Sequence, residues 1–200
     1  GSAINFVGSS SNSYMKASFI EVRDAVADRS WYHDGLEVHG TVKRDVVAPG
    51  AELVGYKFTG NYNNYLFQPY LDHMYPDTGE VTVSVWLKRP SSGSLRYAIC
   101  RGTADATETY RLGVKDDAIY WDYGNGAAYT RVDVGVPTDE WFHLLVSVKE
   151  GEAGQVWMNG KEMDGLYGVN NPAPNPLMDA TSYTTLVGRH YNNDHTYAFD

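Results

Sequence analysis

The chain has 200 residues, enough for one full-sized domain and a modest extension. Hydrophobic residues make up 42% and charged residues 20%, proportions typical of globular domains rather than of disordered chains. Twenty-five acidic against sixteen basic residues give a net charge of −9, which argues against nucleic acid and anionic membranes as partners, because both require clustered Lys and Arg. No run approaches the roughly 18 apolar residues of a membrane span.

Residues 1–50 are irregular and are expected to form an N-terminal extension. Gly1-Ser2 resembles the remnant of a cleaved expression tag, and a serine-rich stretch follows. A capping box and one apolar face then predict a helix, formed by Ser18, Phe19, Glu21, Val22 and Val26. After an extended stretch at 36–42, Pro49-Gly50 marks the boundary to a regular region that covers residues 51–200.

The regular region has the two-residue period of β-strands. One alternation places Val81, Val83, Val85 and Leu87 on one face, with Thr82, Ser84, Trp86 and Lys88 on the other. A second places Phe142, Leu144, Val146 and Val148 against Trp141, His143, Leu145 and Ser147. Each pattern predicts a strand with one face in a core.

Shorter strands are predicted between turn signals, at 54–58, 65–68, 96–101, 109–114, 118–123, 130–134, 155–158 and 185–188. Asn159-Gly160 is the strongest hairpin signal and joins 155–158 to 161–163. Many short strands with no helical pattern between them predict an all-β fold, an antiparallel β-sandwich of the jelly-roll kind.

Five groups of segments run in order from residue 56 to the end: Tyr56-Lys57-Phe58-Thr59-Gly60 with Tyr65-Leu66, residues 81–88, Trp141-Phe142-His143, residues 156–161, and Leu186-Val187-Gly188-Arg189 with Phe199-Asp200. This ordered series resembles the laminin-G-like branch of the concanavalin A-like lectin/glucanase fold. The resemblance implies a sandwich over residues 51–200.

Two earlier stretches, 28–42 and 48–54, resemble the lead-in to such domains in bacteriophage tail proteins. They imply a location on a virion tail or otherwise outside the cell. In the family, a final strand bearing a carboxylate follows the Phe-Asp-Gly segment, whereas this sequence stops at Asp200. We therefore expect the sandwich to lack its final strand or to take it from a neighbouring element, because an open sheet edge invites pairing.

Catalytic motifs are absent from the sequence. Glucanases of this fold use a Glu-x-Asp-x-x-Glu-like array, and none occurs here; nor does a Gly-x-Ser-x-Gly elbow, a phosphate loop or a His-Glu-x-x-His motif. The acidic pairs Asp116-Asp117 and Asp139-Glu140 are interpreted as solvated turn acids. His143 is interpreted as a hydrogen-bonded structural histidine rather than a base. The chain is predicted not to be an enzyme.

The candidate ligand-binding residues are aromatic and amide-rich. A sugar site needs an aromatic platform with amides and carboxylates around it, and one loop best meets that need, together with Tyr120 on a predicted strand. The loop consists of Tyr191, Asn192, Asn193, Asp194 and His195. The alternative is that Tyr and Asn simply suit β-edges and tight turns. For the neighbouring Trp121, core packing explains the residue at least as well as ligand stacking.

No cofactor and no metal site are predicted. Asn192-Asn193-Asp194 and Asp105 offer oxygen ligands for a structural calcium ion, but calcium takes six to eight oxygens from several segments. Cys100, the one cysteine, is predicted to be a buried small hydrophobe.

Three functions remain open. The first is a non-catalytic carbohydrate- or cell-surface-binding module of a phage tail or similar virion appendage, with a surface glycan or host cell-surface receptor as partner. The second is a structural or interaction domain that binds no sugar and pairs in a homo-oligomer or with another virion protein. The third, ranked last, is a glycan-degrading enzyme.

Overall fold

A computed structural model describes residues 35–46, 54–71, 79–89, 93–102, 108–124, 128–163, 183–191 and 199. The chain divides into two compact units, residues 1–35 with 44–56, and residues 36–43 with 57–200. In the smaller unit, β2 (Lys43–Val46) and β3 (Val54–Lys57) form a two-stranded sheet. The helix expected near Ser18–Val26 lies outside the described residues, and no described helix is long and apolar enough to cross a bilayer.

The larger unit contains a seven-stranded antiparallel sheet in the order β1-β4-β13-β6-β7-β8-β9. Its strands are β1 (Glu37–His39), β4 (Tyr65–Gln68), β6 (Arg96–Gly102), β7 (Glu108–Lys115), β8 (Ala118–Tyr123), β9 (Ala128–Asp133) and β13 (Thr184–Val187). The edge strand β1 comes from the segment that the sequence assigned to the N-terminal extension, where residues 36–42 were expected to be extended.

The second sheet has four antiparallel strands in the order β12-β11-β10-β5. They are β5 (Glu80–Leu87), β10 (Phe142–Lys149), β11 (Gln155–Met158) and β12 (Lys161–Glu162). The turn between β11 and β12 has positive φ at both Asn159 (52°) and Gly160 (79°). Because a tight hairpin turn needs positive φ at both central residues, Asn-Gly suits it, and the predicted hairpin is confirmed.

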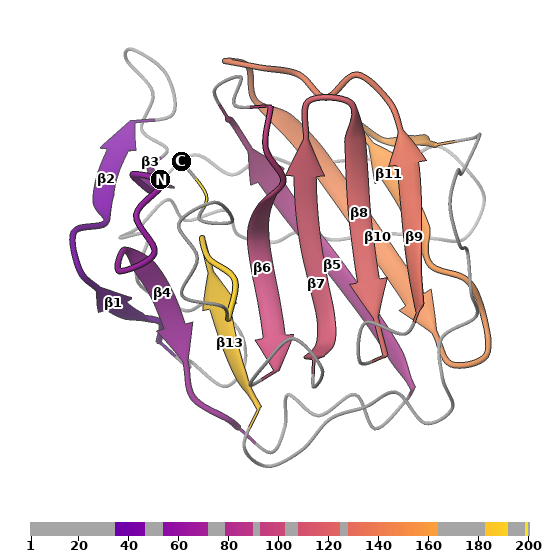
Figure 1. The fold of residues 1–200 in the computed structure, drawn as a ribbon, viewed down its shortest axis with the longest axis horizontal. Coiled ribbons are helices and arrows are strands. Elements are labelled where there is room, and N and C mark those ends of the chain that lie inside the picture. Colours follow the sequence, from indigo (N-terminus) through magenta and orange to yellow (C-terminus); the bar gives the residue numbers. More distant parts are fainter. Residues whose placement is uncertain are drawn as a thin grey trace, which may run out of the picture. The chain divides into compact units, whose positions relative to one another are not determined.

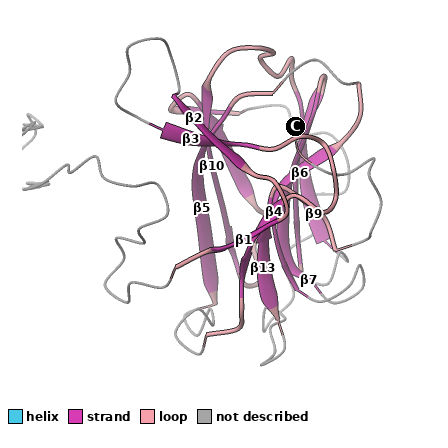
Figure 2. Cartoon of the chain, turned by 90° about the vertical axis from the view of Figure 1, so that its left-hand side faces the viewer, coloured by secondary structure: helices cyan, strands magenta, loops and turns pink. Residues whose placement is uncertain are grey.

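The two sheets pack face to face, with β5, β10 and β11 behind β6–β9 in Figure 1 and a two-layered profile in Figure 2. The core between them is lined by fully buried side chains from both sheets, including Leu112, Ile119, Trp121, Leu144 and Val146. Trp121 Nε1 donates a hydrogen bond to the Ser147 carbonyl oxygen at 3.2 Å, which joins the two layers. The all-β antiparallel sandwich is therefore confirmed, as is the core position of Trp121.

Near the end of the chain, Phe199 is held by its backbone. Its N–H donates to the Gly188 carbonyl at 2.9 Å, and its carbonyl accepts from the Gly60 N–H at 3.0 Å. Its ring packs edge-on against Phe58. The absence of a final strand stays a prediction.

Candidate functional site

Tyr191 is the described member of the predicted sugar-binding loop. Its hydroxyl donates to the Thr184 carbonyl oxygen at 2.5 Å and lies 3.0 Å from the Cys100 carbonyl oxygen. Burial raises the pKa of this phenol far above its ordinary value. The hydroxyl thus anchors Tyr191 to β13 and β6, so a ligand at this residue would meet the ring rather than the hydroxyl. Asn192, Asn193, Asp194 and His195 lie outside the described residues, and their role stays a prediction.

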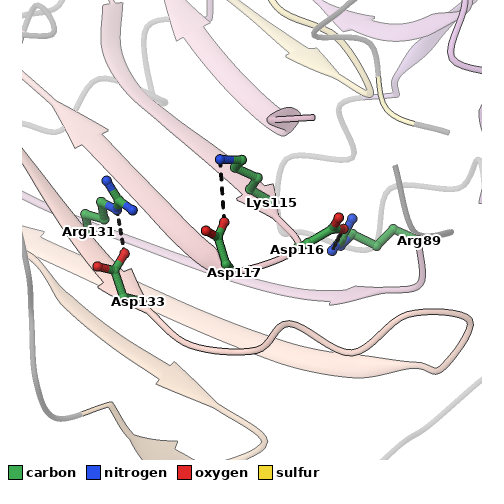
Figure 3. Close-up of polar contacts among 6 residues, drawn as sticks. All are labelled: Arg89, Lys115, Asp116, Asp117, Arg131 and Asp133. Carbon is green, nitrogen blue, oxygen red and sulfur yellow. Dashed lines mark hydrogen bonds and ion pairs between the residues drawn. The ribbon is translucent and has the colours of Figure 1, made fainter. Parts of the chain in front are cut away.

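Tyr120, the other candidate, is half-buried on the outer face of β8. The Arg131 guanidinium lies 5.3 Å from the centre of its ring, and Arg131 Nε donates to Asp133 Oδ1 at 2.5 Å. Figure 3 shows this pair beside the contact between Lys115 and Asp117. A cation already occupies one face of the Tyr120 ring, so this ring is a poorer sugar platform than an open one.

Both acidic pairs named from the sequence lie in turns. Asp116 and Asp117 form the turn between β7 and β8, and Asp139-Glu140 precedes β10 in an exposed bend. Asp116 Oδ1 accepts from Arg89 Nη2 at 2.5 Å, as Figure 3 shows. The interpretation of these residues as turn acids is confirmed.

A buried polar cluster of Arg111, Asp122 and His190 lies on the outer side of β7 and β8. Arg111 Nε donates to Asp122 Oδ2 at 2.5 Å, and Arg111 Nη1 lies 2.8 Å from His190 Nε2. Because a guanidinium only donates, His190 Nε2 is the acceptor in this contact. Burial raises the pKa of Asp122, and the adjacent Arg111 opposes that rise.

The cluster is closed to ligands. Asp122 is 6% exposed and His190 3%. The ring of Tyr97 covers both partners of the contact, with the Arg111 guanidinium 5.1 Å and the His190 ring 4.7 Å from its centre. These groups therefore stabilise the outer side of the sheet and are unsuited to contact a ligand.

The outer face of the four-stranded sheet is different in character. Alternation directs one set of side chains outward there, which we call the tryptophan face: Ser84 and Trp86 on β5, His143 and Leu145 on β10, and Trp157 on β11. Trp86 is 63% exposed, while His143, Leu145 and Trp157 are half-buried. Hydroxyls and an amide continue the same face at Thr82, Ser147 and Gln155.

Trp86 is held in place although it is exposed. Its ring centre lies 5.3 Å from that of His143, its cross-strand partner, and the two planes are tilted by 45°. His143 Nε2 is 2.8 Å from Ser84 Oγ, and the His143 backbone N–H donates to Asn159 Oδ1 at 2.9 Å. The hydrogen bonds expected of His143 are present, and its ring packs beside Trp86; its interpretation as a structural histidine rather than a base stays a prediction.

The tryptophan face was not predicted from the sequence. One indication of it was present, because the alternation in β5 places Trp86 on the polar, solvent-directed side of the strand together with Thr82 and Ser84. A large aromatic side chain at a solvent-directed strand position departs from the usual burial of such residues and marks a candidate contact surface. Its neighbours His143 and Trp157 could not be placed beside it without knowing how β5, β10 and β11 pair.

Metal-binding groups are sparse in the part of the chain that the structure describes. Within it, no three His, Cys, Asp or Glu side chains gather closely enough to hold an ion. Asp105 and Asn192-Asn193-Asp194, the residues named for calcium, lie outside it. Cys100 is fully buried, as predicted.

Comparison with known families decides the identity of the fold. Residues 59–200, more than half of the chain, match the laminin-G-like family described as the concanavalin A-like lectin/glucanases superfamily. The chain belongs to this superfamily. The resemblance inferred from the ordered segments is thereby confirmed, and the match spans both sheets of the concanavalin A-like sandwich apart from β1.

Several solved structures share this concanavalin A-like fold. The binding domain of Paraclostridial Mosquitocidal Protein 1 aligns with a TM-score of 0.60 at 16% identity, over 86% of this chain and 43% of that one. The binding domain of botulinum neurotoxin serotype G gives 0.56 at 12% identity, over 80% and 43%. A botulinum neurotoxin type C structure, titled for cell entry that depends on interaction with two ganglioside molecules, gives 0.52 at 14%, over 80% and 42%.

These likenesses show the fold alone. The chain spans less than half the length of the toxin binding domains that it matches. A comparison with curated proteins finds no match.

Proposed function

We propose that this domain is a non-catalytic carbohydrate- or cell-surface-binding module and that the tryptophan face contacts the ligand. The observation that carries the proposal is Trp86, which exposes 63% of its surface on the outer face of the four-stranded sheet and packs beside His143. Sugars present apolar C–H faces that stack on aromatic rings, and their hydroxyls bind amides and hydroxyls. The tryptophan face offers both kinds of group on neighbouring strands.

Two further points support the proposal. The chain lacks the carboxylate array by which glucanases of the superfamily cleave sugars. Its structural relatives include toxin domains named for binding, among them one titled for ganglioside interaction. The resemblance of residues 28–42 and 48–54 to phage tail proteins adds a virion appendage as the expected setting, with a host surface glycan or receptor as partner.

The direct test is a glycan array that includes bacterial surface polysaccharides, probed with the natural chain and two variants. We expect Trp86→Ala to lose binding by roughly tenfold or more, because a stacked tryptophan is a typical energetic centre of an interface. Tyr120→Ala, which removes a half-buried aromatic from the other sheet, is the matched control and should bind normally. Binding lost only in Tyr120→Ala would move the site to the seven-stranded sheet.

An exposed tryptophan also suits a protein partner, which is the alternative of an interaction domain that binds no sugar. Light scattering of the same two variants separates these functions. An oligomer that dissociates in Trp86→Ala, together with an array without hits, would replace the lectin proposal by the interaction domain.

A further inference from the structure

We infer that the tryptophan face takes an extended, uncharged oligosaccharide that crosses β5, β10 and β11, rather than a single sugar or an acidic polysaccharide. The inference rests on the proposed function and specifies its ligand class. It follows from where the strand pairing places the two tryptophans and from how charge is distributed on that face.

The strand register sets the spacing of the two indoles. Trp86 lies opposite His143, whereas Trp157 lies opposite Leu145, two residues further along β10. Strands about 4.8 Å apart with a rise of about 3.4 Å per residue then put the Cα atoms of Trp86 and Trp157 about 12 Å apart. One pyranose ring covers one indole and cannot reach the second. A ligand that uses both tryptophans must therefore be a chain of several sugars running diagonally across the strands.

The surface between the tryptophans suits such a chain. His143 and Leu145 on β10 lie on either side of that diagonal, and Ser84, hydrogen-bonded to His143, adjoins it on β5. Along one flank, the hydroxyls of Thr82 and Ser147 lie 3.4 Å apart, and Gln155 is the cross-strand partner of Ser147. These neutral donors and acceptors match sugar hydroxyls and offer no ion pair to a carboxylate.

Charge on the described part of this face lies at its margins. Lys149 is paired with Glu80 at 3.7 Å and with Glu152 at 3.4 Å, so its ammonium is already matched. Glu162 is exposed directly opposite Trp157 and adds a negative charge at the far end, whereas Lys88, exposed two residues beyond Trp86, adds a positive charge at the near end. Acidic groups thus outnumber basic ones around the face, and together with the net charge of −9 on the whole chain they disfavour polyanions.

The test measures binding of oligomers with one to six rings from neutral polymers (N-acetylglucosamine chains, β-glucans, mannans) and from acidic ones (polygalacturonate, hyaluronan, polysialic acid). Affinity for a neutral series should rise with length until the chain reaches both indoles. Trp86→Ala and Trp157→Ala should each lower the affinity for the longest oligomer roughly tenfold and flatten its dependence on length. Tyr120→Ala should change neither.

Because Trp157 is half-buried, Trp157→Phe serves as a second variant that keeps the strand packed, and unfolding curves of all variants establish that they fold. Binding of an acidic series, or a monosaccharide bound as tightly as the hexamer, would overturn the inference and leave the lectin proposal standing. No binding to any saccharide would overturn both.

Discussion

On the outer side of the seven-stranded sheet, the charged and aromatic groups are used up by one another: Arg111 is matched by Asp122 and covered by Tyr97, and Arg131 lies on Tyr120. On the outer side of the four-stranded sheet, Trp86 is left open, and its neighbour His143, hydrogen-bonded to Ser84, packs beside it. The two faces arise from the same strand alternation. The difference indicates that one face has been completed by the fold itself, whereas the other retains surface for a partner.

The largest effect is expected from removing the cation of the buried ion pair on the seven-stranded sheet, which tests whether the polar groups of that face stabilise the fold. Arg111→Met should leave the Asp122 carboxylate, 6% exposed, without its cation, and lower the free energy of unfolding by about 3 kcal/mol. Urea denaturation measures the loss. On the other sheet, Lys149→Met removes an exposed cation paired with Glu80 and should leave the unfolding midpoint unchanged. Equal losses in the two variants would contradict the comparison.

A smaller effect is expected from filling space on the same side of the sheet. A Cβ added at Gly113 would lie 2.9 Å from both Leu95 Cδ1 and Tyr97 Cε1. Gly113→Ala should therefore destabilise the protein by about 1–3 kcal/mol through overpacking, measured by thermal or chemical unfolding. Gly135→Ala is the control, because an added Cβ there meets nothing within 4 Å. A neutral Gly113→Ala would mean that Tyr97 does not close this surface tightly.

The anchoring role of Tyr191 can be tested by removing one oxygen. Tyr191→Phe leaves the Thr184 and Cys100 carbonyls without this donor and should cost about 1 kcal/mol of unfolding free energy. Tyr120→Phe, which keeps its ring against Arg131, is the matched comparison and should be close to neutral. If Tyr191→Phe were as stable as the natural chain but bound glycan more weakly, the hydroxyl would belong to a ligand site.

The smallest effect is a dependence of stability on pH. Because burial raises the pKa of Asp122 above its ordinary 3.8, the folded protein holds this proton more tightly than the unfolded chain does. The stability that this residue contributes should therefore fall as the pH rises from 3.8 through the raised value. The stability of the natural chain relative to Asp122→Asn, measured across that range, should decrease with pH. A relative stability that increased would show that Arg111 outweighs burial and lowers the pKa.

Most strands and the hairpin could be predicted because each depends on a pattern among residues that are neighbours in the sequence. The alternation from Val81 to Leu87 and from Phe142 to Val148 gave β5 and β10, and Asn159-Gly160 gave the hairpin, since each depends on neighbouring residues. The strands at 65–68, 118–123 and 155–158 have the predicted bounds.

The candidate site could not be predicted in the same way. Whether Trp86 lies beside His143 depends on a register between strands almost 60 residues apart, and the chain shows no local trace of it. Likewise, the hydrogen bonds from the Tyr191 hydroxyl to Cys100 and Thr184 can be recognised only once β6 and β13 are paired. Local sequence patterns predict the strands and turns. Pairing between strands far apart in the sequence decides which polar side chains bind one another and which remain exposed.

The place of β13 has a consequence for how the protein folds. This strand lies between β4 and β6, where Thr185 pairs with Gln68, 117 residues earlier (185 − 68), and with Arg101. Until residues 184–187 have been synthesised, the pair β1 and β4 and the four strands β6 to β9 remain two pieces with unpaired inner edges. Such non-local closure is slow, in the range of about milliseconds to seconds for all-β domains. Closure of the sheet therefore has to wait for β13, and until then the unpaired edges of β4 and β6 are open to non-native pairing.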